Sequence, residues 1–209
     1  MKKTSFLIMA IALLSFNLLA QDEPSIFNFG IKAGGNFSNV YDSQGDQFKA
    51  DGKYGAAFGA FASISFGKVL GFQPEVLYSE KGFKSTGTVL GNAYEMTRST
   101  GYIDVPFLLA IKPISMLTIL VGPQFSFLVN EKNSFTTSTT SVLQEQEFKN
   151  DNVRKNTLCL TGGVDLNFSH FILGARAGYD MQQNNGDGTS TTPRYKNAWY
   201  QATIGYRFL

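Results

Sequence analysis

The last eleven residues, 199–209, read Trp-Tyr-Gln-Ala-Thr-Ile-Gly-Tyr-Arg-Phe-Leu. Apolar or aromatic side chains occupy every second position from Tyr200 to Phe208, and small or polar side chains stand between them. Successive side chains of a strand point to opposite faces, so this stretch predicts a β-strand with one apolar and one polar face. The same alternation recurs along most of the chain, which predicts an all-β protein.

Eight segments show this alternation, and together they predict an eight-stranded antiparallel up-and-down β-barrel. The expected strands span residues 27–40, 53–66, 69–82, 93–110, 116–129, 155–168, 171–181 and 199–209. The connections at 67–68, 111–115 and 169–170 are short, whereas those at 41–52, 83–92, 130–154 and 182–196 are long and polar. An even strand number with alternately short and long connections is typical of transmembrane barrels of the bacterial outer membrane, whose short turns face the periplasm.

The N-terminal residues have the composition of an export signal. Lys2 and Lys3 precede an apolar run at 6–19, and Ala20 followed by Gln21 suits cleavage. We therefore expect residues 1–20 to be a cleaved signal peptide and residues 21–209 to form one outer-membrane barrel domain. The alternative is a retained anchor, but the run is shorter than the roughly 20 residues that a spanning helix needs.

Alternation alone does not separate a membrane barrel from a soluble, lipocalin-like barrel, whose apolar side chains point inward. Here the polar faces carry few charges of mixed sign, and the apolar faces are rich in Phe and Tyr near the strand ends. Paired charges suit a narrow polar lumen, and aromatic rims suit the two membrane interfaces. Both features favour a barrel with lipid outside, located in the bacterial outer membrane. The formal net charge of +2 gives no reason to expect a nucleic-acid partner.

Three prolines fall inside the predicted strands, at Pro74, Pro106 and Pro123. Each removes a backbone donor from the hydrogen-bond ladder, so we expect bulges or bends near these positions.

Several segments resemble the PorT-like outer-membrane β-barrel family of Bacteroidota. The resemblance is carried by Phe-Gln-Pro-Glu-Val-Leu-Tyr-Ser-Glu-Lys-Gly at 72–82, Tyr-Ile-Asp-Val-Pro-Phe-Leu-Leu at 102–109, and Val-Gly-Pro-Gln-Phe-Ser-Phe-Leu at 121–128. The opening Gly-Ile-Lys-Ala-Gly-Gly-Asn-Phe-Ser at 30–38 and the closing Gly-Tyr-Arg-Phe at 205–208 also fit. The resemblance implies an eight-stranded barrel surrounded by outer-membrane lipid and inserted by the assembly machinery that reads the last strand.

Seven charged residues fall on the polar faces of the predicted strands, and we expect them to form a polar network inside the barrel: Lys32, Glu75, Arg98, Asp104, Asp165, Arg176 and Arg207. The three carboxylates could in principle perform acid–base chemistry. Salt bridges with the four cations are the favoured interpretation, because an eight-stranded barrel is only just wide enough for its own side chains. For the same reason we expect negligible conductance.

No catalytic, cofactor or metal site is predicted. His170 is the single histidine and lies in a short turn expected to be periplasmic, and Cys159 is the single cysteine. One histidine and one cysteine do not suffice for a conventional zinc site.

We therefore expect a non-enzymatic outer-membrane barrel with a structural, adhesion or envelope-complex accessory role through its long outer loops. The Thr/Ser run at 134–141 is hypothesised to extend its hairpin beyond the membrane and to offer a recognition edge. Two alternatives remain open at this point: an outer-membrane barrel enzyme acting on lipid or peptide, and a soluble lipocalin-like carrier of an apolar ligand.

Overall fold

The computed structural model describes residues 26–41, 50–89, 92–137, 141–145, 154–184 and 196–208, so the expected signal peptide at 1–20 lies outside the described residues. The described strands are β1 (Phe27–Tyr41), β2 (Ala50–Phe66), β3 (Leu70–Val89), β4 (Asn92–Ile114), β5 (Leu117–Thr137), β6 (Ser141–Glu145), β7 (Asn156–Phe168), β8 (Phe171–Asp180) and β9 (Lys196–Arg207). No helix within these ranges is long and apolar enough to cross a membrane.

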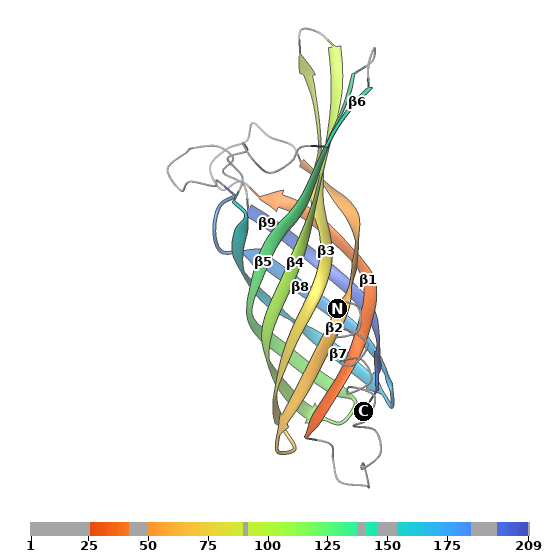
Figure 1. Ribbon diagram of the computed structural model, residues 1–209, viewed down its shortest axis with the longest axis vertical. Coiled ribbons are helices and arrows are strands. Elements are labelled where there is room, and N and C mark those ends of the chain that lie inside the picture. Colours follow the sequence, from red (N-terminus) through yellow and green to blue (C-terminus); the bar gives the residue numbers. More distant parts are fainter. Residues whose placement is uncertain are drawn as a thin grey trace, which may run out of the picture.

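Eight of these strands form a closed antiparallel barrel (Figure 1). Hydrogen-bonded neighbours follow the order β4-β3-β2-β1-β9-β8-β7-β5, and the pairing of β4 with β5 closes the sheet. The remaining strand, β6, pairs with residues 132–136 of β5 beyond the barrel. The eight-stranded up-and-down fold is therefore confirmed. Because short turns face the periplasm in such barrels, we call the end with the turns at 67–69, 115–116 and 169–170 the periplasmic end, and the opposite end the outer end.

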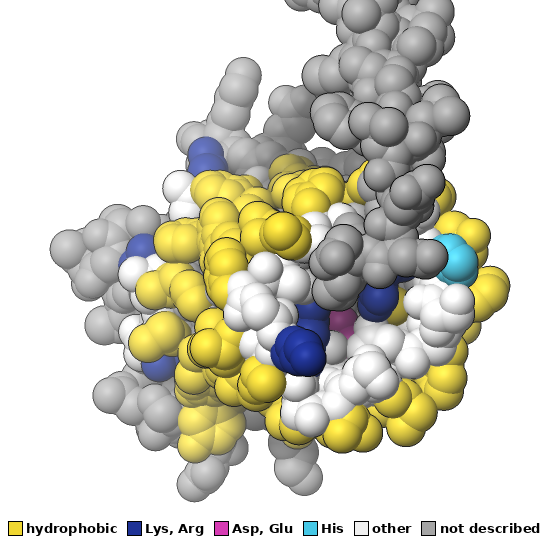
Figure 2. All heavy atoms as spheres, turned by 90° about the horizontal axis from the view of Figure 1, so that it is seen from below, with side chains coloured by type: hydrophobic (Ala, Val, Ile, Leu, Met, Phe, Trp, Pro, Cys, Tyr) yellow, Lys and Arg dark blue, Asp and Glu magenta, His cyan; other side chains and the backbone are white. Residues whose placement is uncertain are grey.

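Apolar side chains lie on the outer surface of the barrel, and polar side chains fill the lumen. Strand β8 alternates without exception between exposed and buried positions. Predicted rim aromatics are among the exposed side chains: Phe27, Tyr54, Phe66, Phe168, Phe171, Tyr179, Tyr206 and Phe208. Seen from the periplasmic end, hydrophobic atoms surround a polar and charged centre (Figure 2). This orientation is opposite to that of a soluble barrel, so the lipocalin-like alternative is wrong.

Two strands, β3 and β5, continue well past their predicted outer ends, whereas β4, predicted from residue 93, begins at Asn92. Residues 83–92 were expected to be a loop, but β3 and β4 stay paired as far as Val89 and Asn92. Likewise β5 runs to Thr137 inside the loop predicted at 130–154, and β6 pairs with its end. Threonine and other β-branched residues in these stretches favour extended structure. The segments 85–89, 92–98, 130–137 and 141–145 form a sheet above the barrel, which we call the outer sheet (Figure 1).

The three strand prolines do not produce the expected bulges. Strand pairing is interrupted near them, for example between Pro74↔Phe107 and Leu77↔Asp104, but the register is the same on either side. The register shifts that do occur lie elsewhere, between residues 52 and 57 of β2, at 101/102 of β4 and at 111/114 of β4. The ladder therefore accommodates each missing donor locally, with the register unchanged.

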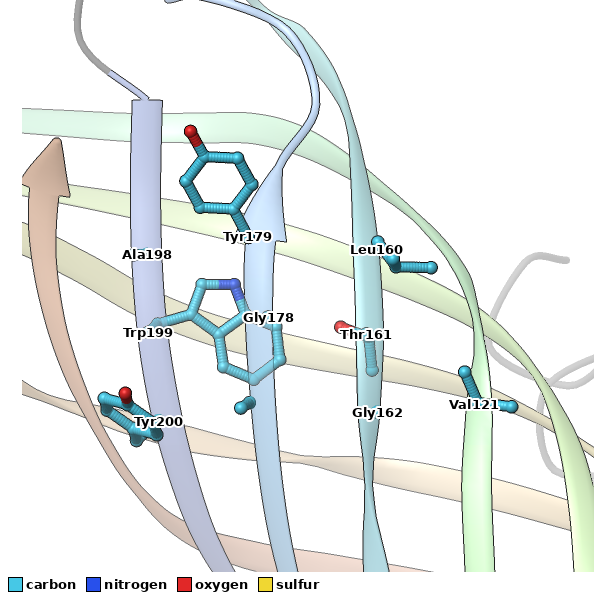
Figure 3. A pocket seen from close by; sticks show the side chains of 10 residues that line it. Val121, Leu160, Thr161, Gly162, Gly178, Tyr179, Ala198, Trp199 and Tyr200 are labelled. Carbon is cyan, nitrogen blue, oxygen red and sulfur yellow. The ribbon is translucent and has the colours of Figure 1, made fainter. Parts of the chain in front are cut away.

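Trp199 shows how tightly the lumen is packed. Its side chain is 3% exposed and lies across Gly178 of the neighbouring strand (Figure 3). A Cβ atom at Gly178 would overlap the indole ring and crowd the Thr161 hydroxyl. On the other face of the same strands, small residues leave a groove of about 480 Å³ between Leu160 and Tyr200 (Figure 3).

The substitution Gly178→Ala should therefore destabilise the barrel by about 1–3 kcal/mol, because a rigid ring must move to admit the methyl group. Gly162→Ala is the matched control. A Cβ there comes no closer than 3.6 Å to another atom, and a change below about 1 kcal/mol is expected. Urea unfolding in detergent micelles measures both, and equal midpoints for the two variants would contradict the packing described here.

Candidate functional site

The seven predicted lumen residues do not form one network. Four of them, Lys32, Glu75, Asp165 and Arg176, come together in the periplasmic half of the lumen. The other three pair with residues that the prediction did not include. The alternation of a strand assigns a face to each residue, but it does not assign its height in the barrel, and height decides which side chains meet across the lumen.

The four residues that meet form what we call the inner ion cluster. The Lys32 Nζ lies 2.7 Å from the Glu75 Oε1. The Arg176 guanidinium donates to both oxygens of Asp165, at 2.7 and 3.0 Å, and its Nη2 is 3.5 Å from the Glu75 Oε1. Gln73 donates from its Nε2 to Glu75 at 2.9 Å and to Asp165 at 3.3 Å. Two cations and two carboxylates thus neutralise one another, with side-chain exposures of 1–5%.

Asp104 belongs to a second group nearer the outer end, the outer ion cluster. Its carboxylate pairs with Lys81, whose Nζ lies 2.9 Å from the Asp104 Oδ2. The same ammonium lies 5.0 Å from the ring centroid of Tyr102 and 5.1 Å from that of Trp199. Aromatic faces attract a cation, so the two rings help to hold Lys81 in a position that is 1% exposed.

Asp180 extends the outer ion cluster. Its Oδ2 accepts a hydrogen bond of 2.6 Å from the Asn197 Nδ2, and Lys81 attracts its charge. The site prediction missed both Lys81 and Asp180. Each stands on the polar face of its strand, so the signal was present in the sequence, but nothing in the pattern indicated that they approach Asp104.

Neutral side chains occupy the space near and between the clusters. Gln201 donates to the Asn36 Oδ1 at 2.9 Å, and the Asn36 Nδ2 donates to the Ser79 Oγ at 2.7 Å. Gln124 accepts from the Thr161 Oγ1 at 3.3 Å. An interior cavity that is lined in part by residues 98–102 has a volume of only about 10 Å³, which is close to the least that one water molecule needs.

Arg98 and Arg207, which were predicted to pair with lumen carboxylates of the network, lie at opposite ends of the barrel. Arg98 forms an ion pair with Glu131 at the base of the outer sheet. Arg207 donates to the Asn167 Oδ1 near the periplasmic end. Strands β4 and β9 run over the full height of the barrel. Two side chains can therefore both point into the lumen and still lie far apart, as these two guanidinium groups do.

The single histidine and the single cysteine have different surroundings. His170 lies exposed in the turn between β7 and β8, with its Nδ1 3.1 Å from the Ser169 Oγ and its ring against Tyr206. Cys159 is buried and free. Among the described residues, no group of three or more His, Cys, Asp or Glu side chains is arranged to hold a metal ion.

The outer sheet is the other candidate surface. Exposed polar side chains cover part of it, and an ion pair of 3.7 Å between Lys84 and Glu95 links two of its strands near the barrel. In the part of the chain that the structure describes, β6 has β5 as its one strand neighbour. An edge strand leaves backbone donors and acceptors available to a partner.

Comparisons with known proteins agree with this geometry. The model of a family described as "outer membrane protein beta-barrel domain" matches residues 19–181. The structure is similar to that of Ail, the attachment invasion locus protein of Yersinia pestis, with 15% identity, a TM-score of 0.50, and coverage of 88% of this chain and 100% of that chain. Neisserial surface protein A (14% identity, TM-score 0.45, 86% and 97% coverage) and OprG of Pseudomonas aeruginosa (14%, 0.39, 87% and 95%) are also similar. No curated protein in the comparison matches the chain.

The inner ion cluster predicts a large effect from removing one charge. Glu75→Gln leaves Lys32 and Arg176 with one carboxylate between them, and it should cost about 3–5 kcal/mol of unfolding free energy. Glu95→Gln breaks the half-exposed pair with Lys84 and should cost no more than about 1 kcal/mol. Unfolding in urea and micelles measures both; a Glu75 variant as stable as the Glu95 variant would show that the cluster contributes little.

The filled lumen predicts that the purified protein conducts no sustained ion current. Lys81, Gln124 and Asp104 are each less than 2% exposed and lie across the path of an ion. Recording in planar lipid bilayers measures this directly, with an open porin as the positive control. Stable single-channel steps from the folded protein would contradict it.

Proposed function

The chain belongs to the outer-membrane protein β-barrel domain family, and we propose that it is a non-enzymatic member that binds an extracellular partner through its outer sheet. Its place in the bacterial outer membrane agrees with the apolar outer surface of the barrel. One observation carries the proposal: three membrane strands continue beyond the barrel and present β6 as an edge strand.

An edge strand is a chemically specific binding surface. A partner can add a strand to it through backbone hydrogen bonds, while alternate side chains provide selectivity. Polar side chains on the described part of the sheet keep it soluble: Thr86, Glu95 and Thr136 are exposed. Pairing with another protein then satisfies backbone groups that water otherwise solvates.

The lumen supports a role without catalysis. Glu75, Asp104 and Asp165 are each paired with a cation and at most 3% exposed. A general acid or base must reach its substrate within hydrogen-bond distance, and these carboxylates lie in a packed interior. His170 lies in a turn at the end opposite the outer sheet.

The proposal includes a narrower family and a route to the membrane. The motifs at 72–82, 102–109 and 121–128 support a PorT-like member of the family. The composition of residues 1–20 supports export through a cleaved signal peptide, and the amphipathic strand β9 supports insertion by the machinery that recognises a barrel's last strand. Membrane lipid is then the partner of the apolar outer surface.

Replacing residues 133–150 with a short Gly-Ser turn should abolish binding of the outer partner, because it removes β6 and the strand that holds it. Replacing residues 185–195, another outer connection, is the matched control and should leave binding unchanged. Adhesion of expressing cells and proteins photo-crosslinked from position 136 are the measurements. If the two deletions behave alike, the outer sheet is not the binding surface.

Two single substitutions in β6 distinguish the loss of its backbone hydrogen bonds from the loss of the whole loop as the cause of lost binding. Leu143→Pro removes one backbone donor of β6, whereas Leu143→Thr keeps it and favours a strand. We expect crosslinking to fall with the proline variant and to persist with threonine.

A further inference from the structure

Polar side chains line the periplasmic end of the lumen, and we call them the mouth ring: Ser65, Lys112, Thr118, Asn167 and Arg207. Arg207 donates to the Asn167 Oδ1, and the Asn167 Nδ2 donates to the Thr118 Oγ1 at 3.0 Å. On another part of the ring, the Lys112 Nζ donates to the Ser65 Oγ at 2.9 Å. Viewed from this end, Lys and Arg side chains stand at the opening with an acidic side chain behind them (Figure 2).

The two cations of the mouth ring have neutral hydrogen-bond partners. Among the described residues, no carboxylate lies within ion-pair distance of Lys112 or Arg207. The nearest acidic group deeper in the lumen, Asp165, attracts Arg207, but both of its oxygens already accept hydrogen bonds from Arg176. Because the inner ion cluster is neutral by itself, the described side chains of the mouth ring carry the two positive charges of Lys112 and Arg207 without a paired carboxylate.

Two further observations point to a missing anion. Lys112 and Arg207 are close enough to repel one another. In addition, the Arg207 Nε is buried and has no hydrogen-bond partner among the described residues. An unsatisfied buried donor calls for an explanation, and a bound ion is one of the few that also relieves the repulsion.

We propose that the mouth ring binds an oxyanion from the periplasm, with phosphate-like chemistry, between Lys112 and Arg207. A guanidinium presents several N–H donors in one plane and matches two oxygens of such a group. The Lys112 ammonium supplies a second charge-assisted donor, and both side chains are only partly buried, so solvent reaches them from the periplasm.

The mouth ring differs from the rest of the described lumen because its two cations have no paired carboxylate. Elsewhere in the described lumen each buried Lys or Arg faces a carboxylate, as Lys32 faces Glu75 and Lys81 faces Asp104. A purely structural ring would follow the same rule. The exposed Lys68, in the turn at the same end, adds to the positive potential that attracts an anion but lies outside the ring.

Inorganic phosphate is the probe, titrated at constant ionic strength with chloride into the full mature chain in detergent micelles. The readout is the side-chain Nε–H signal of Arg207 in ¹H–¹⁵N spectra. We expect a saturable shift of this signal. Lys112→Gln should weaken binding roughly 10- to 100-fold, as the loss of one charge-assisted contact predicts. Lys68→Gln removes the same charge outside the ring and should change the affinity much less.

The design remains decisive if a variant folds poorly, because the titration of the unsubstituted protein stands alone. No saturable shift with phosphate or sulfate overturns the proposal, as does equal weakening by Lys112→Gln and Lys68→Gln. A double variant, Asp22→Asn with Glu23→Gln, tests whether the chain supplies the anion itself. If only this double variant binds phosphate, acidic residues of the same chain fill the site and a periplasmic ligand is wrong.

Discussion

A strand inside a bilayer must have all its backbone donors and acceptors paired, because the hydrocarbon offers no water to replace a missing partner. The closure of the sheet by β4 and β5 meets this requirement, and the other features follow from it. Closure fixes which face of each strand meets lipid, which explains why apolar and polar residues alternate so regularly in β8 and β9. It also explains why Pro74, Pro106 and Pro123 interrupt pairing without shifting the register: a slip of one residue would turn every following side chain to the wrong face.

Closing eight strands leaves a lumen that the side chains must fill. Charged residues can be buried there only if each is paired, and the two ion clusters do this at different heights, with Asn36, Ser79 and Gln201 between or beside them. Gly178 is needed for the same close packing. Its missing side chain makes room for Trp199, and the Trp199 ring covers Lys81. The interior therefore stabilises the wall, and interaction with other molecules is left to the two ends.

The fold, the outward orientation of the apolar faces and most strand positions could be predicted from the sequence. A period of two, as in β9, indicates which side chains share a face. The pairing inside the lumen could not. Asp104 meets Lys81 and Arg98 meets Glu131, because the stagger of the strands sets their heights, and stagger leaves no mark in the alternation of single strands. The outer extension of β3 was missed for a different reason: residues 84–88, Lys-Ser-Thr-Gly-Thr, are polar or small on both faces, so their composition is that of a loop although pairing with β4 makes them one arm of a hairpin.

The outer sheet is continuous with three strands of the barrel wall: β3, β4 and β5 each run unbroken from one into the other, with a register shift at 101/102 of β4 near the junction. This continuity has a mechanical consequence. A pull on the outer sheet along the strands acts parallel to β3, β4 and β5, so it loads many inter-strand hydrogen bonds together, in shear, and does not open them one after another. The tension passes into the closed wall, where the neighbouring strands share it. A surface built in this way can hold a partner against flow or movement, with the whole membrane-embedded barrel as its anchor.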